Sequence, residues 1–175
     1  MSHANNLVIF VGLFYTLRHL CPINVLRSLY FSLFNSHMSC GIAVWGNADS
    51  SYIDRIKILQ KKAIRAITFS TRDTPSKPLF KSINILCIED VLHLQLCSLM
   101  WDYDHGTLPL ALSCYFEKID LFHRFETRMS SQGKLSLNKF NTETYGNKSF
   151  RIQGSKIRND RKDMEIYINA CLVDT

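Results

Sequence analysis

Apolar residues recur at helical spacing along the chain up to about residue 116. The clearest example runs from Tyr52 to Ile67, where apolar side chains return every three or four positions and leave the opposite side polar. Ser51 and Asp54 have the spacing of a capping box, which predicts that this helix begins near Tyr52. Its packed face is predicted to contain Ile53, Ile56, Leu59, Ala63, Ile64 and Ile67.

Two apolar segments precede this helix. Residues 7–17 (LVIFVGLFYTL) contain no charge, which predicts a helix of the core. A membrane-spanning helix needs about 20 such residues, so no span is expected, and a membrane-peripheral role for this run stays an alternative. Pro22 occupies the place of a first-turn proline, and Arg27 is the one charged residue between Pro22 and Phe34. This second helix is therefore predicted to be buried on most sides.

A loop and two further helical segments follow. Pro75 and Pro78 predict a basic loop over residues 68–78. Glu89 and Asp90 favour a helix start through the helix dipole, and Gly106 is a natural helix end. Another short segment is predicted from residue 107 to residue 116.

The composition changes after residue 117. Ser, Asn, Thr, Lys and Arg replace the aliphatic runs, and basic residues outnumber acidic ones between residues 118 and 162. Such a stretch predicts an extended arm with weak tertiary anchoring. We therefore expect a mainly α protein, with a small helical bundle over residues 1–116 and a basic, poorly structured, partly disordered C-terminal extension over residues 117–175.

Length and composition are those of a folding chain. The 175 residues are 46% hydrophobic and 21% charged, which fits one domain, or one domain with an appendage. The six cysteines contain no CxxC pair, and most stand beside apolar residues. This pattern favours reduced thiols in an intracellular protein, cytoplasmic or nuclear, over a zinc finger or a disulfide framework.

Positive charge is concentrated in one stretch. The chain carries 21 Lys and Arg against 15 Asp and Glu, a net charge of +6, and the segment from Asp54 to Lys81 has the same net charge. The polar side of the predicted helix within this segment contains Arg55, Lys57, Lys61, Lys62 and Arg65. Two interpretations stay open: an ordinary solvated face, or a face that contacts a phosphate backbone.

Residues that could support catalysis or bind a metal are sparse. Glu89–Asp90 and Asp102–Asp104 are the close acid pairs, and the first is better explained by a helix dipole than by a metal. His93 and Cys97 have the spacing of half a metal site, without a visible second half. No nucleophile elbow, phosphate-binding Gly-rich loop or dinucleotide fingerprint occurs. The sequence therefore predicts no enzyme activity of its own, no cofactor and no metal.

Several blocks of the chain resemble, in order, the region after the polymerase palm in reverse transcriptases of non-LTR retrotransposons, the Jockey-like and related animal families. Residues 29–47 (LYFSLFNSHMSCGIAVWGN) are similar to that family's LYxSLIxPHLxYGIxxWG pattern, and residues 59–67 (LQKKAIRAI) to its LQ(K/N)KAIRxI. Further similar blocks are residues 12–19, 78–86, 108–116, 123–128 and 145–159.

The resemblance implies a helical thumb that closes on a template–primer duplex, followed by a C-terminal extension. The family's (Y/F)xDD polymerase motif is absent from this sequence. The resemblance therefore implies a non-catalytic fragment that contains the duplex-binding thumb but not the catalytic centre. It also implies a nucleic-acid partner, RNA or DNA, bound through its backbone without sequence preference. The residues expected to face phosphates are Lys57, Lys61, Lys62 and Arg65, with Arg72, Lys77 and Lys81 behind them.

Two departures from the family pattern bear on the structure. Val8, Ile9 and Phe10 stand where the family's first thumb helix is usually richer in Lys, which is expected to leave an apolar face uncovered. Residues 161–175 match no block. The alternative functions are a helical protein-interaction module without a nucleic-acid role and a membrane-peripheral protein, and the oligomeric state is not predicted.

Overall fold

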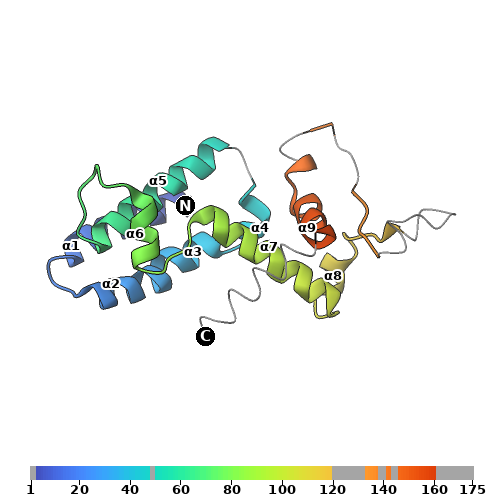
Figure 1. The fold of residues 1–175 in the computed structure, drawn as a ribbon, viewed down its shortest axis with the longest axis horizontal. Coiled ribbons are helices and arrows are strands. Elements are labelled where there is room, and N and C mark those ends of the chain that lie inside the picture. Colours follow the sequence, from blue (N-terminus) through green and yellow to red (C-terminus); the bar gives the residue numbers. More distant parts are fainter. Residues whose placement is uncertain (1–2, 48–49, 120–132, 138–140, 143–145, 161–175) are drawn as a thin grey trace. The chain divides into compact units, whose positions relative to one another are not determined.

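The computed structural model describes residues 3–47, 50–119, 133–137, 141–142 and 146–160, and these are mainly helical, as predicted (Figure 1). They contain no strand, and Lys118 and Leu135 form an isolated antiparallel bridge. Contacts divide the chain into an N-terminal unit (Met1–Leu92) and a C-terminal unit (His93–Thr175). The expected organisation into residues 1–116 and 117–175 stays a prediction.

The N-terminal unit is built around α1 (His3–Leu17) and α5 (Ser50–Ile67), which lie side by side (Figure 1). In α1, Leu7, Val11 and Phe14 are buried at helical spacing, so residues 7–17 do form a core helix. The other side of α1 is uncovered, as expected, and Ile9 is 66% exposed. No helix in the described part of the chain combines the length and apolar character that a membrane span requires.

The second helical segment consists of α2 (Ile23–Leu29), the π-helix η1 (Tyr30–Asn35) and α3 (Ser36–Ser39). Its core side chains recur at every fourth position: Leu26, Tyr30, Phe34 and Met38. In a regular α-helix each step of four positions drifts by about 40° around the axis. The wider π turn reverses part of this drift, so that all four side chains stay on one side.

This narrow stripe corrects one sequence prediction. The second helix is not buried on most sides, because Ile23, Val25 and Phe31 are exposed. Only the stripe that faces α1 and α5 is packed. At the other positions of this segment, an apolar side chain does not indicate burial. The short α4 (Ile42–Trp45) follows, after Gly41 in the left-handed conformation.

Helix α5 has the predicted face and begins at Ser50, close to the predicted start. Ile56, Ala63, Ile64 and Ile67 are buried, and Ile53 and Leu59 are half-buried. The helix ends at Ile67, and two residues later Phe69 has a left-handed φ of 56°, with the Ser70 amide donating to the Arg65 carbonyl at 3.0 Å.

The loop predicted for residues 68–78 is shorter than expected. Helix α6 (Ser76–Ser82) begins inside it and contains Pro78 in its first turn. A first-turn residue has no intrahelical acceptor for its backbone N–H, so a proline is tolerated there. The prediction was therefore wrong for residues 76–78, where Pro78 starts a helix instead of preventing one.

One polar side chain, Gln60 of α5, lies in the core of the N-terminal unit and is 1% exposed. Its Nε2 donates to the Tyr30 hydroxyl oxygen and to the Leu86 carbonyl, both at 2.9 Å. Its Oε1 accepts from the Ile88 amide at 3.1 Å, at the first residue of α7 (Ile88–Asp104). A single carboxamide thus joins α5, η1 and the start of α7.

The C-terminal unit contains residues 93–104 of α7, α8 (Leu110–Ser113) and α9 (Phe150–Asn159), with Met100, Phe116 and Leu135 at its core. Residues 150–159 were predicted to belong to an extended arm, so α9 is a helix that the sequence interpretation missed. A Cβ on Gly154 would lie 2.9 Å from Met100 Cε, so the two helices approach closely there. Residues 120–132, 138–140, 143–145 and 161–175 of the predicted arm lie outside the described residues.

Replacing Gln60 by Leu is expected to lower the free energy of unfolding by about 3 kcal/mol, because it leaves three buried polar groups without their partner. Urea denaturation followed by circular dichroism measures this loss. Gln95→Leu, at an exposed position of α7, is the matched control and should change stability little. Equal stability of the two variants would contradict the role of Gln60.

Candidate nucleic-acid interface

The apolar face of α5 packs inward and therefore turns a basic face outward. Arg55, Lys61 and Lys62 are exposed on this face. None of the three has an ion-pair partner among the described residues. Within that part of the chain their charges are exposed and unpaired, which is the state from which a side chain can replace a counterion on a phosphate.

Lys57 lies on the same helix but is used within the unit. Its Nζ is 2.9 Å from Glu89 Oε1, in the first turn of α7, and 3.5 Å from Asp54 Oδ1. The hydrogen bond to Glu89 raises the pKa of Lys57. Burial opposes ionisation of Glu89, but the hydrogen bond from Lys57 and the backbone amide outweigh it and lower the Glu89 pKa. The charge of Lys57 is therefore largely compensated in place.

Arg65 is also engaged, although its partner is a backbone carbonyl. Its Nε and one terminal guanidinium nitrogen donate to the Thr74 carbonyl at 3.2 and 3.1 Å. Arg65 is half-buried, and these bonds hold the turn at residues 71–75 against the last turn of α5. Its positive charge has no ion-pair partner among the described residues, yet its position is set by the turn.

The remaining predicted contacts, Arg72, Lys77 and Lys81, are exposed in the turn and on α6. Lys77 and Lys81 are one helical turn apart and share a face of α6. Because α6 packs against α5, the structure brings all seven predicted residues onto two adjoining helices and the turn between them (Figure 1).

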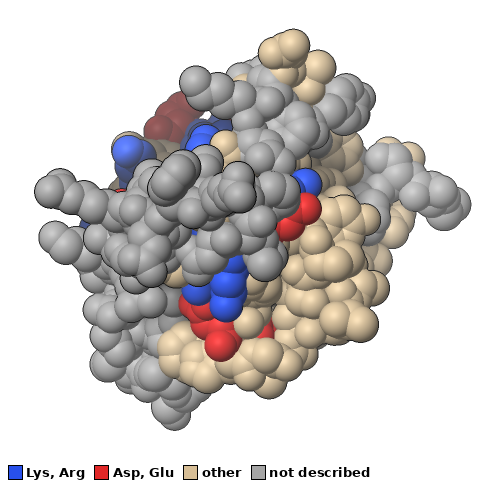
Figure 2. Space-filling view, turned by 90° about the vertical axis from the view of Figure 1, so that its right-hand side faces the viewer, with Lys and Arg blue, Asp and Glu red and all other residues tan. Residues whose placement is uncertain are grey.

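Basic side chains of the C-terminal unit are differently placed, and two of them are paired. Arg151 lies 3.2 Å from Glu117 Oε2, and Arg158 Nε lies 2.7 Å from Asp104 Oδ1. On the face drawn in Figure 2, described Lys and Arg atoms likewise adjoin Asp and Glu atoms. The charges of Arg151 and Arg158 are therefore compensated within the unit, so these two side chains are weaker candidates for phosphate contacts than Lys61 and Lys62.

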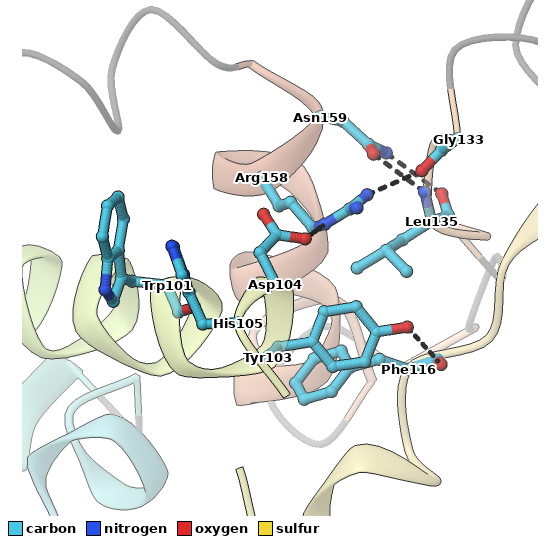
Figure 3. Close-up of polar contacts among 9 residues, drawn as sticks. All are labelled: Trp101, Tyr103, Asp104, His105, Phe116, Gly133, Leu135, Arg158 and Asn159. Carbon is cyan, nitrogen blue, oxygen red and sulfur yellow. Dashed lines mark hydrogen bonds and ion pairs between the residues drawn. The ribbon is translucent and has the colours of Figure 1, made fainter. Parts of the chain in front are cut away.

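Arg158 and Asn159 form a polar cluster at the end of α9 (Figure 3). Arg158 also donates to the Gly133 carbonyl at 2.7 Å and lies 5.6 Å from the centre of the Tyr103 ring. The Asn159 carboxamide accepts from the Leu135 amide at 2.9 Å and donates to the Leu135 carbonyl at 3.0 Å. It thus pairs with Leu135 as a neighbouring strand would, and the cluster fixes residues 133–135 to α9.

The acidic pairs and the candidate metal ligands of the sequence have local partners or stand apart in the described residues. They contain no group of three His, Cys, Asp or Glu side chains placed to hold a metal ion. Glu89 pairs with Lys57, and Asp90 accepts a hydrogen bond from the Cys87 thiol at 2.9 Å. An open depression beside α2, lined by Asn24, Val25, Ser28, Leu29 and Ser32, contains no titratable group among these residues.

Comparison of the chain with protein-family models, with curated proteins and with solved structures finds no match.

Burial of its thiol, with the hydrogen bond to Asp90, raises the pKa of Cys87 to about 12. Only the thiolate is alkylated, so at about pH 8 iodoacetamide should modify Cys87 at least about tenfold more slowly than the exposed Cys40 and Cys114. Peptide mass spectrometry over a time course measures the three rates. In urea the rates should become similar, and fast modification of Cys87 in the folded chain would refute this environment.

Proposed function

We propose that this chain is the non-catalytic, thumb-like part of a non-LTR retrotransposon reverse transcriptase and holds nucleic acid by its phosphate backbone. The observation that carries the proposal is the set of exposed cations on α5, α6 and the turn between them that have no ion-pair partner in the described part of the chain. The contacting residues are Lys61, Lys62, Arg72, Lys77 and Lys81, and Arg55 adds to the same face.

Lys57 and Arg65 have a supporting part in this proposal. Lys57 ties α5 to the start of α7, and Arg65 ties α5 to the turn that carries Arg72. Both therefore keep the exposed cations in place. Because their side chains are already engaged, they are less available to bind a phosphate than Lys61 or Lys62. The expected binding is independent of base sequence, because contacts to phosphates position a strand without reading its bases.

The charge-neutralising variant K61Q/K62Q/K77Q/K81Q is expected to bind a fluorescent single-stranded RNA at least about tenfold more weakly than the unaltered chain. The plot of log affinity against log salt should become shallower by about three, at 0.7–0.9 for each lost phosphate contact. Fluorescence anisotropy over a salt series measures both. Repeating it with single-stranded DNA, duplex DNA and an RNA–DNA hybrid establishes the preferred strand.

The matched control is K118Q/K134Q/K148Q/K156Q, which removes the same charge from the C-terminal unit and should retain most of the affinity. If both quadruple variants lose affinity equally, net charge alone acts and the interface is wrong. Single K57Q and R65Q variants should mainly lower the melting temperature, since their side chains hold structural contacts.

Protein interaction through α1 is a second candidate function, favoured by the exposed side chains of Val8, Ile9 and Leu13. They lie opposite the buried side of α1, in a helix without a charged residue. An uncharged helix lacks the basic side chains with which peripheral helices approach anionic membranes, so an apolar protein surface fits it better than a lipid headgroup layer.

The variant V8Q/I9Q tests this second candidate. If α1 mediates self-association, native mass spectrometry without nucleic acid should give an oligomer of the unaltered chain and a monomer of the variant. L20Q, at another exposed apolar position, is the control and should remain an oligomer. A monomer of the unaltered chain at all concentrations would argue against self-association through α1.

A further inference from the structure

Thr74 presents a hydroxyl at the surface of the turn between α5 and α6. Its neighbours Thr71, Arg72, Asp73 and Pro75 are exposed, and Thr74 itself is half-buried. The Thr74 hydroxyl lies 2.9 Å from the hydroxyl of Thr71, and the Thr74 backbone belongs to no helix. A segment of this kind can be drawn into the extended form in which enzymes bind peptide substrates.

The residues after Thr74 are those that one class of modifying enzyme recognises. Proline-directed Ser/Thr protein kinases require a proline directly after the acceptor hydroxyl, and several of them prefer a basic side chain two positions further on. Pro75 and Lys77 stand at these places. Of the four prolines in the chain, only Pro75 follows a Ser or Thr, so the sequence offers this class of enzyme a single acceptor.

The structure places the Arg65 guanidinium on the backbone of the same residue, where it is a candidate to receive a phosphate. The Arg65 guanidinium already donates to the Thr74 carbonyl at 3.1 and 3.2 Å, and Arg72 and Lys77 lie within three positions of Thr74 along the chain. Asp73 is the one acid in the turn. Two guanidinium groups and an ammonium group outweigh that carboxylate, so a phosphate here would form charge-assisted hydrogen bonds.

We propose that Thr74 is a phosphorylation site for a proline-directed protein kinase and that phosphorylation releases nucleic acid from the α5–α6 face. The second half of this proposal rests on the proposed function. In the transfer, Thr74 Oγ1 forms a bond to the γ-phosphorus of ATP, and the bond from that phosphorus to the β–γ bridging oxygen breaks. ADP leaves, and the hydroxyl proton passes to the catalytic carboxylate of the kinase.

Release follows from charge. A phosphothreonine adds about two negative charges at neutral pH, in a segment whose net charge between Asp54 and Lys81 is +6. The phosphate binds Arg65 and also attracts Arg72 and Lys77. Arg72 and Lys77 are among the proposed contacts to the nucleic-acid backbone. The new phosphate has the same sign of charge as the nucleic-acid strand and repels it. The remaining cations therefore bind the strand more weakly.

The test treats the full chain with a purified cyclin-dependent protein kinase and ATP. Peptide mass spectrometry should find phosphate on Thr74, none at position 74 of T74V, and phosphate again in T74S. The phosphorylated chain should bind single-stranded RNA at least about tenfold more weakly than the untreated chain. Kinase-treated T74V should keep its affinity.

Two outcomes overturn the proposal. If Thr74 carries no phosphate while a control peptide is modified in the same reaction, Thr74 is not a site for this class of kinase. If Thr74 is phosphorylated and the affinity for RNA is unchanged, phosphorylation does not release nucleic acid, and the second half of the proposal is wrong.

A chain that binds no RNA before treatment refutes the proposed function and the switch together. The site is judged separately, from phosphate incorporation and from the melting temperature. Phosphorylation should raise the melting temperature of the unaltered chain but not of R65Q, because only Arg65 joins the phosphate to α5. An equal shift in both chains would refute Arg65 as the receiving group.

Discussion

The N-terminal unit depends on one buried carboxamide. Gln60 satisfies the Tyr30 hydroxyl oxygen, the Leu86 carbonyl and the Ile88 amide, which belong to three separate parts of the chain. Burial raises the pKa of Tyr30 far above its usual range, so its hydroxyl stays neutral beside the amide. A polar group in a core is favourable only when its partners are all in place, so this contact allows one arrangement of α5, η1 and α7 and excludes neighbouring registers.

The same arrangement decides which cations face solvent. Gln60 directly precedes Lys61 and Lys62, so burying its side chain turns those of the next two residues outward. Lys57, one turn earlier, meets Glu89 because Gln60 holds the start of α7 beside α5. The five basic residues of α5 thus divide into two groups: Lys57 and Arg65 are held by partners elsewhere in the chain, and the other three face solvent.

The C-terminal unit shows how a helix forms where the sequence pattern is weak. Few apolar residues mark α9, but Ile152 and Ile157 are buried, and Gly154 allows the close approach of Met100. Tertiary packing supplies the stability that local propensity lacks. Arg158 and Asn159 then bind residues 133–135, which lie far from them in sequence. Nothing in the local pattern indicates these partners.

The sequence by itself determined the mainly helical class, the face of α5 and the core helix α1, because periodic burial leaves a direct trace in residue order. It also identified the basic residues of the candidate interface, although it placed Lys77 in a loop and did not predict helix α6. It misjudged the second helix, the start of α6 and α9, and it gave no sign that Lys57 and Arg65 are engaged. The exposure of Phe31 and Val25, and the pairing of Lys57 with Glu89, depend on which segments meet in space. Only the tertiary structure decided those contacts, since they join residues whose separation along the chain carries no periodic signal.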